Sequence, residues 1–154
     1  MDESLNELYQ AIILDHSKRP HNQGKLDPCT HCADGYNPLC GDEVTVYLNA
    51  PKDQIEKIQF VGQGCAISKA SASLMTLQLQ GQSIENSVKV FEKIVEFFKE
   101  TNAEAQSLEE LGDLAALAGV AQFPARIKCA TLPWHTFIAA VKGDGKVDVT
   151  SAIE

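Results

Sequence analysis

The sequence predicts an α+β fold, with a small antiparallel sheet followed by helices. Apolar and polar residues alternate in residues 44–48 and again in residues 58–60, as they do in half-buried strands. From Cys65 onward, apolar residues recur at the spacing of amphipathic helices. A chain of 154 residues, 44% of them hydrophobic, is long enough to bury a core of its own. We therefore expect one domain over residues 1–154.

The first element is predicted to be a helix, because Leu5, Leu8 and Ile12 fall on one face. Acidic residues at its start suit the positive end of the helix dipole. The segment 15–24 ends this helix, since it contains a proline, a glycine and a cluster of basic residues. Residues 29–38 are then expected to be irregular, apart from a short strand near Gly35.

Two strands are expected to follow and to pair as an antiparallel hairpin. Residues 44–48 form the first strand, and the Asn, Pro and Asp of residues 49–53 are typical of a turn. Residues 58–60 form the second strand, which Gly62 and Gly64 bring to an end.

The second half of the chain is predicted to be helical. One helix opens at Cys65 and ends at Gly81. Its expected apolar stripe consists of Ile67, Ala70, Leu74 and Leu77. Ser83 is placed as the N-cap of a long amphipathic helix that reaches Phe98.

Two further helical segments complete the predicted fold. After a polar connection over residues 103–107, residues 108–119 carry apolar residues at helical spacing and end at a glycine. Pro124 opens the last main helix, since proline suits the first helical position. Pro133 is expected to kink or restart that helix, because proline has no amide hydrogen to donate. The small and polar tail over residues 143–154 is expected to fray.

The overall charge excludes some classes of partner. The formal net charge is −8, from 21 acidic and 13 basic residues. Such a chain is unsuited to nucleic acid, whose phosphates need clustered Lys and Arg, and better suited to a protein partner with a basic face. No apolar run reaches the ~18 residues of a membrane span. The N-terminus also lacks a signal peptide, so we expect a cytoplasmic protein with reduced thiols.

Three short motifs carry the candidate chemistry. Cys40 lies in Asn-Pro-Leu-Cys-Gly-Asp, with Asp42 two positions later; Cys65 follows Gly-Gln-Gly, and Cys129 ends Arg-Ile-Lys-Cys. Three sulfurs and a carboxylate from distant parts of the chain make a plausible tetrahedral zinc set or a cluster-holding set. An odd number of cysteines, five, also argues against a closed disulfide framework.

The surroundings of two of these cysteines favour a thiolate. Cys65 opens a helix, where free amides and the dipole stabilise negative charge. Cys129 is flanked by Arg126 and Lys128, which would offset the charge of an anionic site. The alternative for each cysteine is an inert position in the core. A phosphate-binding loop is disfavoured, because the glycine motif lacks a third glycine and a Lys-Ser/Thr pair.

A further pair, Cys29 and Cys32, forms a lone C-x-x-C with His31 between the two cysteines. The spacing is compatible with half a zinc site or with a redox pair. No second C-x-x-C completes a four-cysteine zinc site, and we interpret the pair as incidental cysteines of an exposed loop. A Cys-His-Asp protease is disfavoured too, since no nucleophile-elbow or papain-like signature is present.

Taken together, the motifs resemble the U-type iron–sulfur cluster assembly proteins, and specifically their SufU branch. The matching stretches are residues 13–16 with Pro20 and Gly24, residues 37–42, 62–68 and 70–71, residues 118–120 with Pro124, residues 126–129, and Trp134. The resemblance implies a three-stranded antiparallel sheet packed against about five helices. It implies zinc bound by Cys40, Asp42, Cys65 and Cys129. It also implies that Cys40 accepts sulfur from the persulfide of a pyridoxal-phosphate-dependent, SufS-like cysteine desulfurase, for a downstream iron–sulfur assembly scaffold.

Three functional interpretations remain open at this point. The first is a zinc-dependent sulfurtransferase, as in the SufU branch. The second is a scaffold of the IscU type, which builds an iron–sulfur cluster on the same residues. Such scaffolds typically have histidine immediately before the last cysteine, where this chain has Lys128, and a shorter segment between Cys65 and Cys129. The third is a zinc-stabilised structural module without sulfur traffic.

Overall fold

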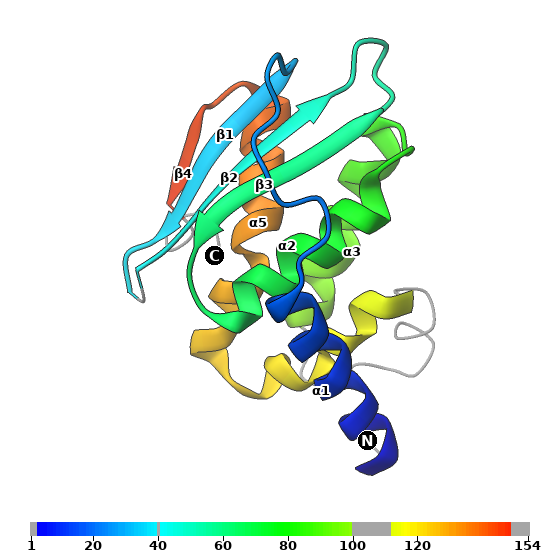
Figure 1. Cartoon of the computed structure of the whole chain (residues 1–154). Helices are drawn as coiled ribbons and strands as arrows, with labels where there is room; N and C mark the ends of the chain where they lie inside the picture. The colour runs from blue at the N-terminus through cyan, green and yellow to red at the C-terminus, as the bar shows by residue number, and fades with distance from the viewer. Residues whose placement is uncertain (1–2, 40, 100–111, 149–154) are drawn as a thin grey trace.

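A four-stranded mixed sheet lies against a layer of helices in the computed structural model (Figure 1). The structure describes residues 3–39, 41–99 and 112–148. The strand order across the sheet is β3-β2-β1-β4. The strands are β1 (His31–Asn37), β2 (Asp42–Asn49), β3 (Lys57–Gln63) and β4 (Lys146–Asp148).

The first three strands pair antiparallel, which confirms the hairpin predicted for β2 and β3. The expectation of a three-stranded, wholly antiparallel sheet is wrong, because β4 pairs in parallel with β1 at Asp34–Tyr36. This fourth strand falls within the tail that was expected to fray, while residues 149–154 lie outside the described residues. Three residues are too few to show an alternating pattern, and β4 depends on its backbone pairing with β1.

The inward face of β2 carries the feature that positions the site. Val44, Val46 and Leu48 alternate into the core and are almost completely buried. Because side chains on a strand repeat every second residue, the same alternation turns Asp42 inward. Asp42 is only 2% exposed, so its carboxylate lies at the end of the sheet and faces the helical layer.

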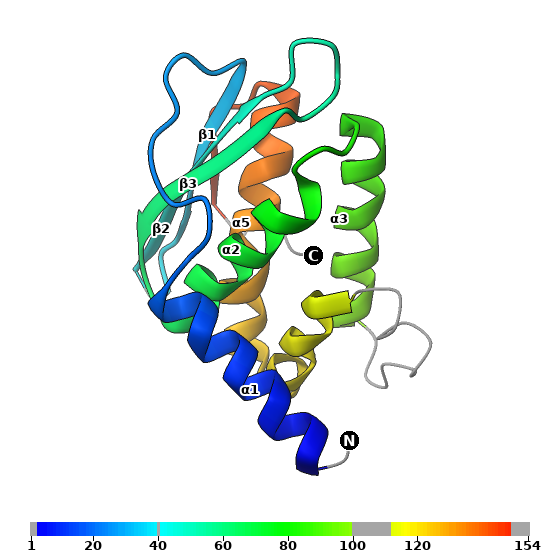
Figure 2. The same cartoon turned by 45° about the vertical axis from the view of Figure 1, so that its right-hand side comes forward.

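Five helical segments occur within the described residues, and α2, α3 and α5 lie on one side of the sheet (Figure 2). They are α1 (Glu3–Lys18), α2 (Ala66–Leu79), α3 (Ile84–Lys99), the 3₁₀ helix η1 (Gly112–Gln122) and α5 (Pro124–Lys142). Ser83 caps α3 as predicted, since its Oγ accepts the Asn86 amide at 3.0 Å. The predicted connection over 103–107 and the first part of the predicted helix over 108–119 lie outside the described residues. None of the described helices is long and apolar enough to cross a bilayer.

Helix α5 is the centre of the helical layer. Every residue from Cys129 to Phe137 is buried, and the helix continues through Pro133 without the restart that the sequence suggested. Strand β1 approaches this helix so closely that a Cβ added at Gly35 would overlap the Thr136 side chain. The sheet and α5 are therefore in direct contact along the core.

A serine joins α2 to α5. The indole Nε1 of Trp134 donates to Ser71 Oγ at 3.1 Å, and the Ser71 hydroxyl donates to the Ala130 carbonyl. Both Ser71 and Trp134 are fully buried. The predicted apolar stripe of α2 was wrong at Leu77, which is 49% exposed. The buried face of α2 that packs against α5 and α1 carries Ser71 and Ser73, and Leu77 lies outside this face.

The end of α1 is attached to the same helix. Nδ1 of His16 lies 2.7 Å from Ser73 Oγ, and the His21 amide donates to the same oxygen at 2.8 Å. Burial lowers the pKa of His16 below its ordinary value of 6.5, and the charge of His21 acts in the same direction. The smaller effects of Asp15 and Asp113 oppose this shift. His16 is therefore held as a neutral hydrogen-bond partner of Ser73.

The stability of the fold should consequently decrease in mild acid. Well above pH 6.5 the His16 imidazole is neutral in both the folded and the unfolded chain. At lower pH the unfolded chain binds a proton at His16, whereas burial opposes protonation in the folded chain. We expect the free energy of unfolding to fall between about pH 7 and pH 5, and to fall less steeply in His16→Gln. Urea titrations across this range measure both slopes. Equal slopes for the two proteins would contradict the role given to His16.

Candidate metal centre

Three side chains from different elements meet at one end of the sheet. Asp42 is the first residue of β2, Cys65 immediately precedes α2, and Cys129 lies in the second turn of α5. The carboxylate oxygen of Asp42 and the two Sγ atoms all lie within 4.8 Å of one another. Among the described residues, this is the one group of three or more His, Cys, Asp or Glu side chains close enough to share a metal ion. Cys40, the fourth predicted ligand, lies outside the described residues.

The Asp42 carboxylate binds the start of α2 through both of its oxygens. Its Oδ1 accepts the Cys65 amide at 2.9 Å, and its Oδ2 lies 3.5 Å from Cys65 Sγ. Helix α2 has no acidic residue in its own first turn and no side-chain cap from Cys65. A carboxylate from a strand therefore supplies the negative charge that the positive end of the helix dipole favours.

Each of the two glycines before Cys65 lies where a side chain would not fit, for a different steric reason. A Cβ at Gly62 would overlap the backbone carbonyl of Glu43, because β3 lies directly against β2 there. A Cβ at Gly64 would lie 2.5 Å from Asp42 Oδ1 and 2.8 Å from its Cγ. The structure shows that Gly64 makes room for the Asp42 carboxylate.

Asn37 makes hydrogen bonds next to Asp42 through both its side chain and its carbonyl. Asn37 is 1% exposed, and its Oδ1 accepts the Leu39 amide at 3.1 Å. The Gly41 amide donates to the Asn37 carbonyl at 2.8 Å, and Gly41 has the positive φ of 78° that glycine adopts readily. The sequence motif drew attention to Cys40 and missed Asn37, whose pairing across the turn with Asp42 was readable only once the strand register was known.

Cys129 is placed by the start of α5. Pro124 occupies the first turn of this helix, as predicted, and Cys129 follows on a buried face with 2% of its surface exposed. Its Sγ lies 3.9 Å from the Ala125 carbonyl one turn earlier. The thiol is thus held inside the protein and directed toward the end of the sheet, where Asp42 lies.

The donor set fits a tetrahedral zinc ion. Zinc holds sulfur at about 2.3 Å and carboxylate oxygen at about 2.0–2.2 Å, so its ligand atoms lie roughly 3.3–3.8 Å apart. The Cys65 Sγ and Asp42 Oδ2 atoms already satisfy this at 3.5 Å, and all three donors lie within 4.8 Å. The same soft sulfur donors also suit iron in an iron–sulfur cluster.

The two basic residues near Cys129 lie on different sides of α5. Arg126 is exposed and lines a groove that it shares with Ala66, the neighbour of Cys65. Lys128 lines a separate cavity of about 180 Å³ together with Val95 and Phe98 of α3. Arg126 is therefore the better placed of the two to act on the charge of the site.

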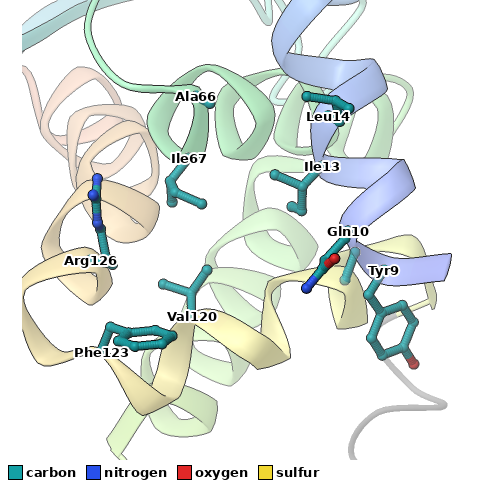
Figure 3. Close-up of a pocket in the computed structure, with 10 residues that line it drawn as sticks. Tyr9, Gln10, Ile13, Leu14, Ala66, Ile67, Val120, Phe123 and Arg126 are labelled. Atoms are coloured by element: carbon teal, nitrogen blue, oxygen red, sulfur yellow. The ribbon is translucent and has the colours of Figure 1, made fainter. Parts of the chain in front are cut away.

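The groove beside the site is apolar and open to solvent. It has a volume of about 850 Å³ and runs between α1, the start of α2, η1 and the start of α5. Figure 3 shows Ile13, Ile67 and Val120 around its opening, with Arg126 at the side of α5. Leu14 and Phe123 on its rim are 52% and 59% exposed.

The remaining cysteines and histidines lie elsewhere. Cys32 lies at the start of β1 and Cys29 just before it, whereas Asp42 pairs with Asn37 at the end of this strand. His16 and His21 belong to the contact between α1 and α2, and His135 packs edge-on against Phe91 of α3. The structure thus brings together the three predicted ligands that it describes, and separates the C-x-x-C pair from them.

The structure combines a small mixed sheet with a donor set of Asp42, Cys65 and Cys129 that could hold a metal ion or a cluster. The family described as "NifU-like N terminal domain" matches residues 8–130. The chain therefore belongs to this family of iron–sulfur cluster assembly proteins, which confirms the predicted resemblance.

Relatives with both kinds of description are similar to this chain. The "Iron-sulfur cluster assembly scaffold protein IscU" of Streptococcus pyogenes serotype M1 is 44% identical over 138 residues, which cover 90% of this chain and 85% of the relative. The "Zinc-dependent sulfurtransferase SufU" of Bacillus subtilis (strain 168) is 41% identical over 134 residues, which cover 85% of this chain and 87% of the relative.

Solved structures share the fold over most of the chain. A crystal structure of a hypothetical protein has a TM-score of 0.80 and 43% identity, and the match covers 89% of this chain and 98% of that one. A protein of Fervidobacterium islandicum AW-1, described as a putative iron–sulfur cluster assembly scaffold for the SUF system, has a TM-score of 0.77 and 30% identity. That match covers 88% of this chain and 98% of the other.

The steric role of Gly64 can be tested by adding one methyl group. With zinc as the probe metal, Gly64→Ala should displace the Asp42 carboxylate and weaken binding by roughly 10- to 100-fold, as loss of a contact that supports a metal ligand does in other proteins. Competition with a chromophoric chelator measures the affinity. In an Asp42→Ala background the added methyl group should have little further effect, because its main clash is gone. Unchanged zinc affinity in the single variant would show that the site tolerates the methyl group.

Proposed function

We propose that this protein is a zinc-dependent sulfur acceptor of iron–sulfur cluster assembly. It takes persulfide sulfur from a pyridoxal-phosphate-dependent, SufS-like cysteine desulfurase onto Cys40. The single observation that carries the proposal is the convergence of Asp42, Cys65 and Cys129 within 4.8 Å at one end of the sheet. Sulfurtransferase activity is accordingly the proposed enzymatic role.

Cys40, Asp42, Cys65 and Cys129 are the proposed zinc ligands. Bound zinc would keep the cysteine sulfurs deprotonated while remaining redox-inert. The Asp42 carboxylate orients the start of α2 through the Cys65 amide. Arg126, exposed beside Ala66, is the proposed counter-charge for the anionic site, and Lys128 is a weaker candidate because it lines the cavity next to α3.

The proposed reaction is a sulfur exchange between two cysteines. The Cys40 thiolate attacks the outer sulfur of the persulfide on the desulfurase. A new S–S bond forms on Cys40 as the old one breaks, and the electron pair leaves on the cysteine thiolate of the desulfurase. Cys40 then carries the persulfide, which passes to a downstream iron–sulfur assembly scaffold.

Two features favour sulfur transfer over cluster building. The residue before Cys129 is Lys128, where scaffolds of the IscU type typically have histidine, and the segment between Cys65 and Cys129 is longer than in that branch. A relative described as a zinc-dependent sulfurtransferase is 41% identical. The second candidate function is an IscU-type scaffold that assembles an iron–sulfur cluster on the same ligands. A relative with that description is 44% identical, and the donor set suits iron as well.

The partner and the compartment follow from the same proposal. A net charge of −8 suits a desulfurase with a basic docking face and disfavours nucleic acid. Reduced thiols are needed for sulfur exchange, so the cytoplasm is the proposed location.

The zinc assignment predicts the behaviour of the two cysteine ligands that the structure describes. Cys65→Ser and Cys129→Ser should lose zinc and have lower melting temperatures, because binding energy becomes folding energy when ligands come from separate elements. Metal analysis and thermal unfolding measure both effects. Cys32→Ser is the matched control, since its thiol lies at the far end of β1, and should retain full zinc content. Full zinc occupancy in both ligand variants would refute the assignment.

The sulfur-accepting role predicts a separate result for Cys40. The protein should stimulate alanine formation by its desulfurase, and Cys40→Ala should abolish this because the accepting sulfur is gone. After incubation with enzyme and cysteine, alkylation and mass spectrometry should find a persulfide on Cys40. Normal stimulation by Cys40→Ala, or persulfide confined to Cys29 or Cys32, would overturn this role.

Asp42→Ala distinguishes the two candidate functions. In a zinc-dependent sulfur acceptor, the variant loses a ligand, so zinc content and sulfur acceptance should both fall. In a scaffold, the variant should instead hold a longer-lived coloured cluster, by analogy with the family. Metal and sulfide analysis with absorption spectra of anaerobically purified protein separates these outcomes.

A further inference from the structure

The pair Cys29 and Cys32 lies on the open face of the sheet, away from the metal centre. Cys32 is exposed on β1, on the opposite face from buried Ala33, and Cys29 precedes the strand and is partly buried. From Cys32 to Asn37 the strand extends about 17 Å, at roughly 3.3 Å per residue. The pair therefore does not belong to the site around Asp42.

The chain between the two cysteines is fixed by Thr30. The Thr30 amide donates to the Leu48 carbonyl and to Asn49 Oδ1, at 3.0 Å each. The Thr30 hydroxyl donates to the Leu48 carbonyl at 3.1 Å and accepts the Ala50 amide at 2.8 Å. The chain bends at this residue, so Thr30 holds the bend against the end of β2.

The bend places the two thiols close enough for a side-chain hydrogen bond. Burial raises the pKa of Cys29, and a side-chain hydrogen bond with Cys32 raises it further. Tyr47, the cross-strand neighbour of Cys32, lies close enough that both thiols raise its pKa after the larger effects of burial and Asp34. The two sulfurs and the phenol thus share one surface patch.

The arrangement of the described residues does not favour a metal site at this patch. Among the described residues, the pair joins no group of three metal-ligating side chains with donors within 4.8 Å of one another. One nitrogen of the imidazole between the cysteines is already paired, since His31 Nδ1 lies 2.8 Å from Thr30 Oγ1. Two adjacent thiols without a third ligand are suited to dithiol chemistry.

We propose that Cys29 and Cys32 form a redox-active dithiol, which closes to an intramolecular disulfide by exchange with a low-molecular-weight disulfide. This modification site is distinct from the proposed zinc centre and does not depend on its function. The proposal goes beyond the interpretation of the pair as incidental loop cysteines, because Thr30 fixes the bend and the thiols lie close enough for a side-chain hydrogen bond.

The exchange proceeds in two balanced steps. The exposed Cys32 loses its proton to solvent and attacks one sulfur of the small disulfide, which forms a mixed disulfide and releases one small thiolate. Cys29 then loses its proton and attacks Cys32 Sγ, which forms the intramolecular bond and releases the second thiolate. The two protein thiols are oxidised by two electrons and the small disulfide is reduced to two thiols.

The charges around the pair predict which disulfides react. Asp27 lies close enough to raise the pKa of Cys29, and Asp34 lies beside Tyr47 on the same patch. These carboxylates repel anionic disulfides and attract cationic ones. Cystamine, which is cationic, should therefore react faster than neutral bis(2-hydroxyethyl) disulfide, and oxidised glutathione, which is anionic, should react most slowly.

The test uses the full-length, zinc-loaded protein and these three disulfides. After reaction, free thiols are blocked with N-ethylmaleimide and the protein is cleaved with chymotrypsin. Trypsin leaves Cys29, Cys32 and Cys40 in one peptide, because no Lys or Arg lies between Lys25 and Lys52. Cleavage after Tyr36 separates the pair from Cys40. The expected product is a peptide lacking two hydrogens and carrying neither a label nor an adduct, with zinc content unchanged.

Matched variants separate a closed pair from ordinary surface thiols. Cys29→Ser should stop at the mixed disulfide on Cys32, because no second thiol resolves it. Thr30→Ala should lower the equilibrium constant for bridge formation roughly tenfold, since two hydroxyl hydrogen bonds that hold the bend are lost. Thr30→Ser keeps the hydroxyl and should restore it. Mixed disulfides accumulating on both cysteines of the unaltered protein, without a bridge, would overturn the proposal.

Discussion

The hydrogen bond from the Cys65 amide to the Asp42 carboxylate is the contact on which the site depends. It joins the first residue of a strand to the first turn of a helix, over a separation of 23 residues. The carboxylate is buried, so it needs partners, and the amides at a helix start are donors without partners inside the helix. Each group therefore satisfies the other, and Gly64 leaves the space in which they meet. The oxygens of Asp42 are directed toward the two cysteine sulfurs as a result.

A second contact keeps the two cysteine-bearing helices together. Ser71 accepts from Trp134 and donates to the Ala130 carbonyl, directly after Cys129 in the chain. Because this hydrogen-bonded set is fully buried, removing one member would leave the others unsatisfied inside the core. The spacing between Cys65 and Cys129 is thereby set by the protein itself. A ligand set prepared in this way needs little rearrangement to bind a metal.

Features that depend on local sequence could be predicted, and those that depend on packing could not. Ser83 as an N-cap and Pro124 as a helix start are properties of a few neighbouring residues, and both are present. The cysteine motifs identified donors that lie together, because each motif carries its own turn or helix start. Strand β4 was missed because its pairing with β1 is created by the return of α5. The exposure of Leu77 and the position of Lys128 beside α3 likewise depend on how the helices pack.

The short parallel strand β4 has a consequence for the behaviour of the protein at high concentration. It pairs with Asp34–Tyr36 along the outer edge of β1. At the opposite edge of the sheet, Gln23 pairs with Phe60 of β3. The outer edges of β1 and β3 are thus each partly covered by another segment of the same chain. An uncovered edge strand is a template on which a second molecule can add a strand and start aggregation. These two short pairings shorten the template on both sides, and should help the folded protein to resist edge-to-edge aggregation.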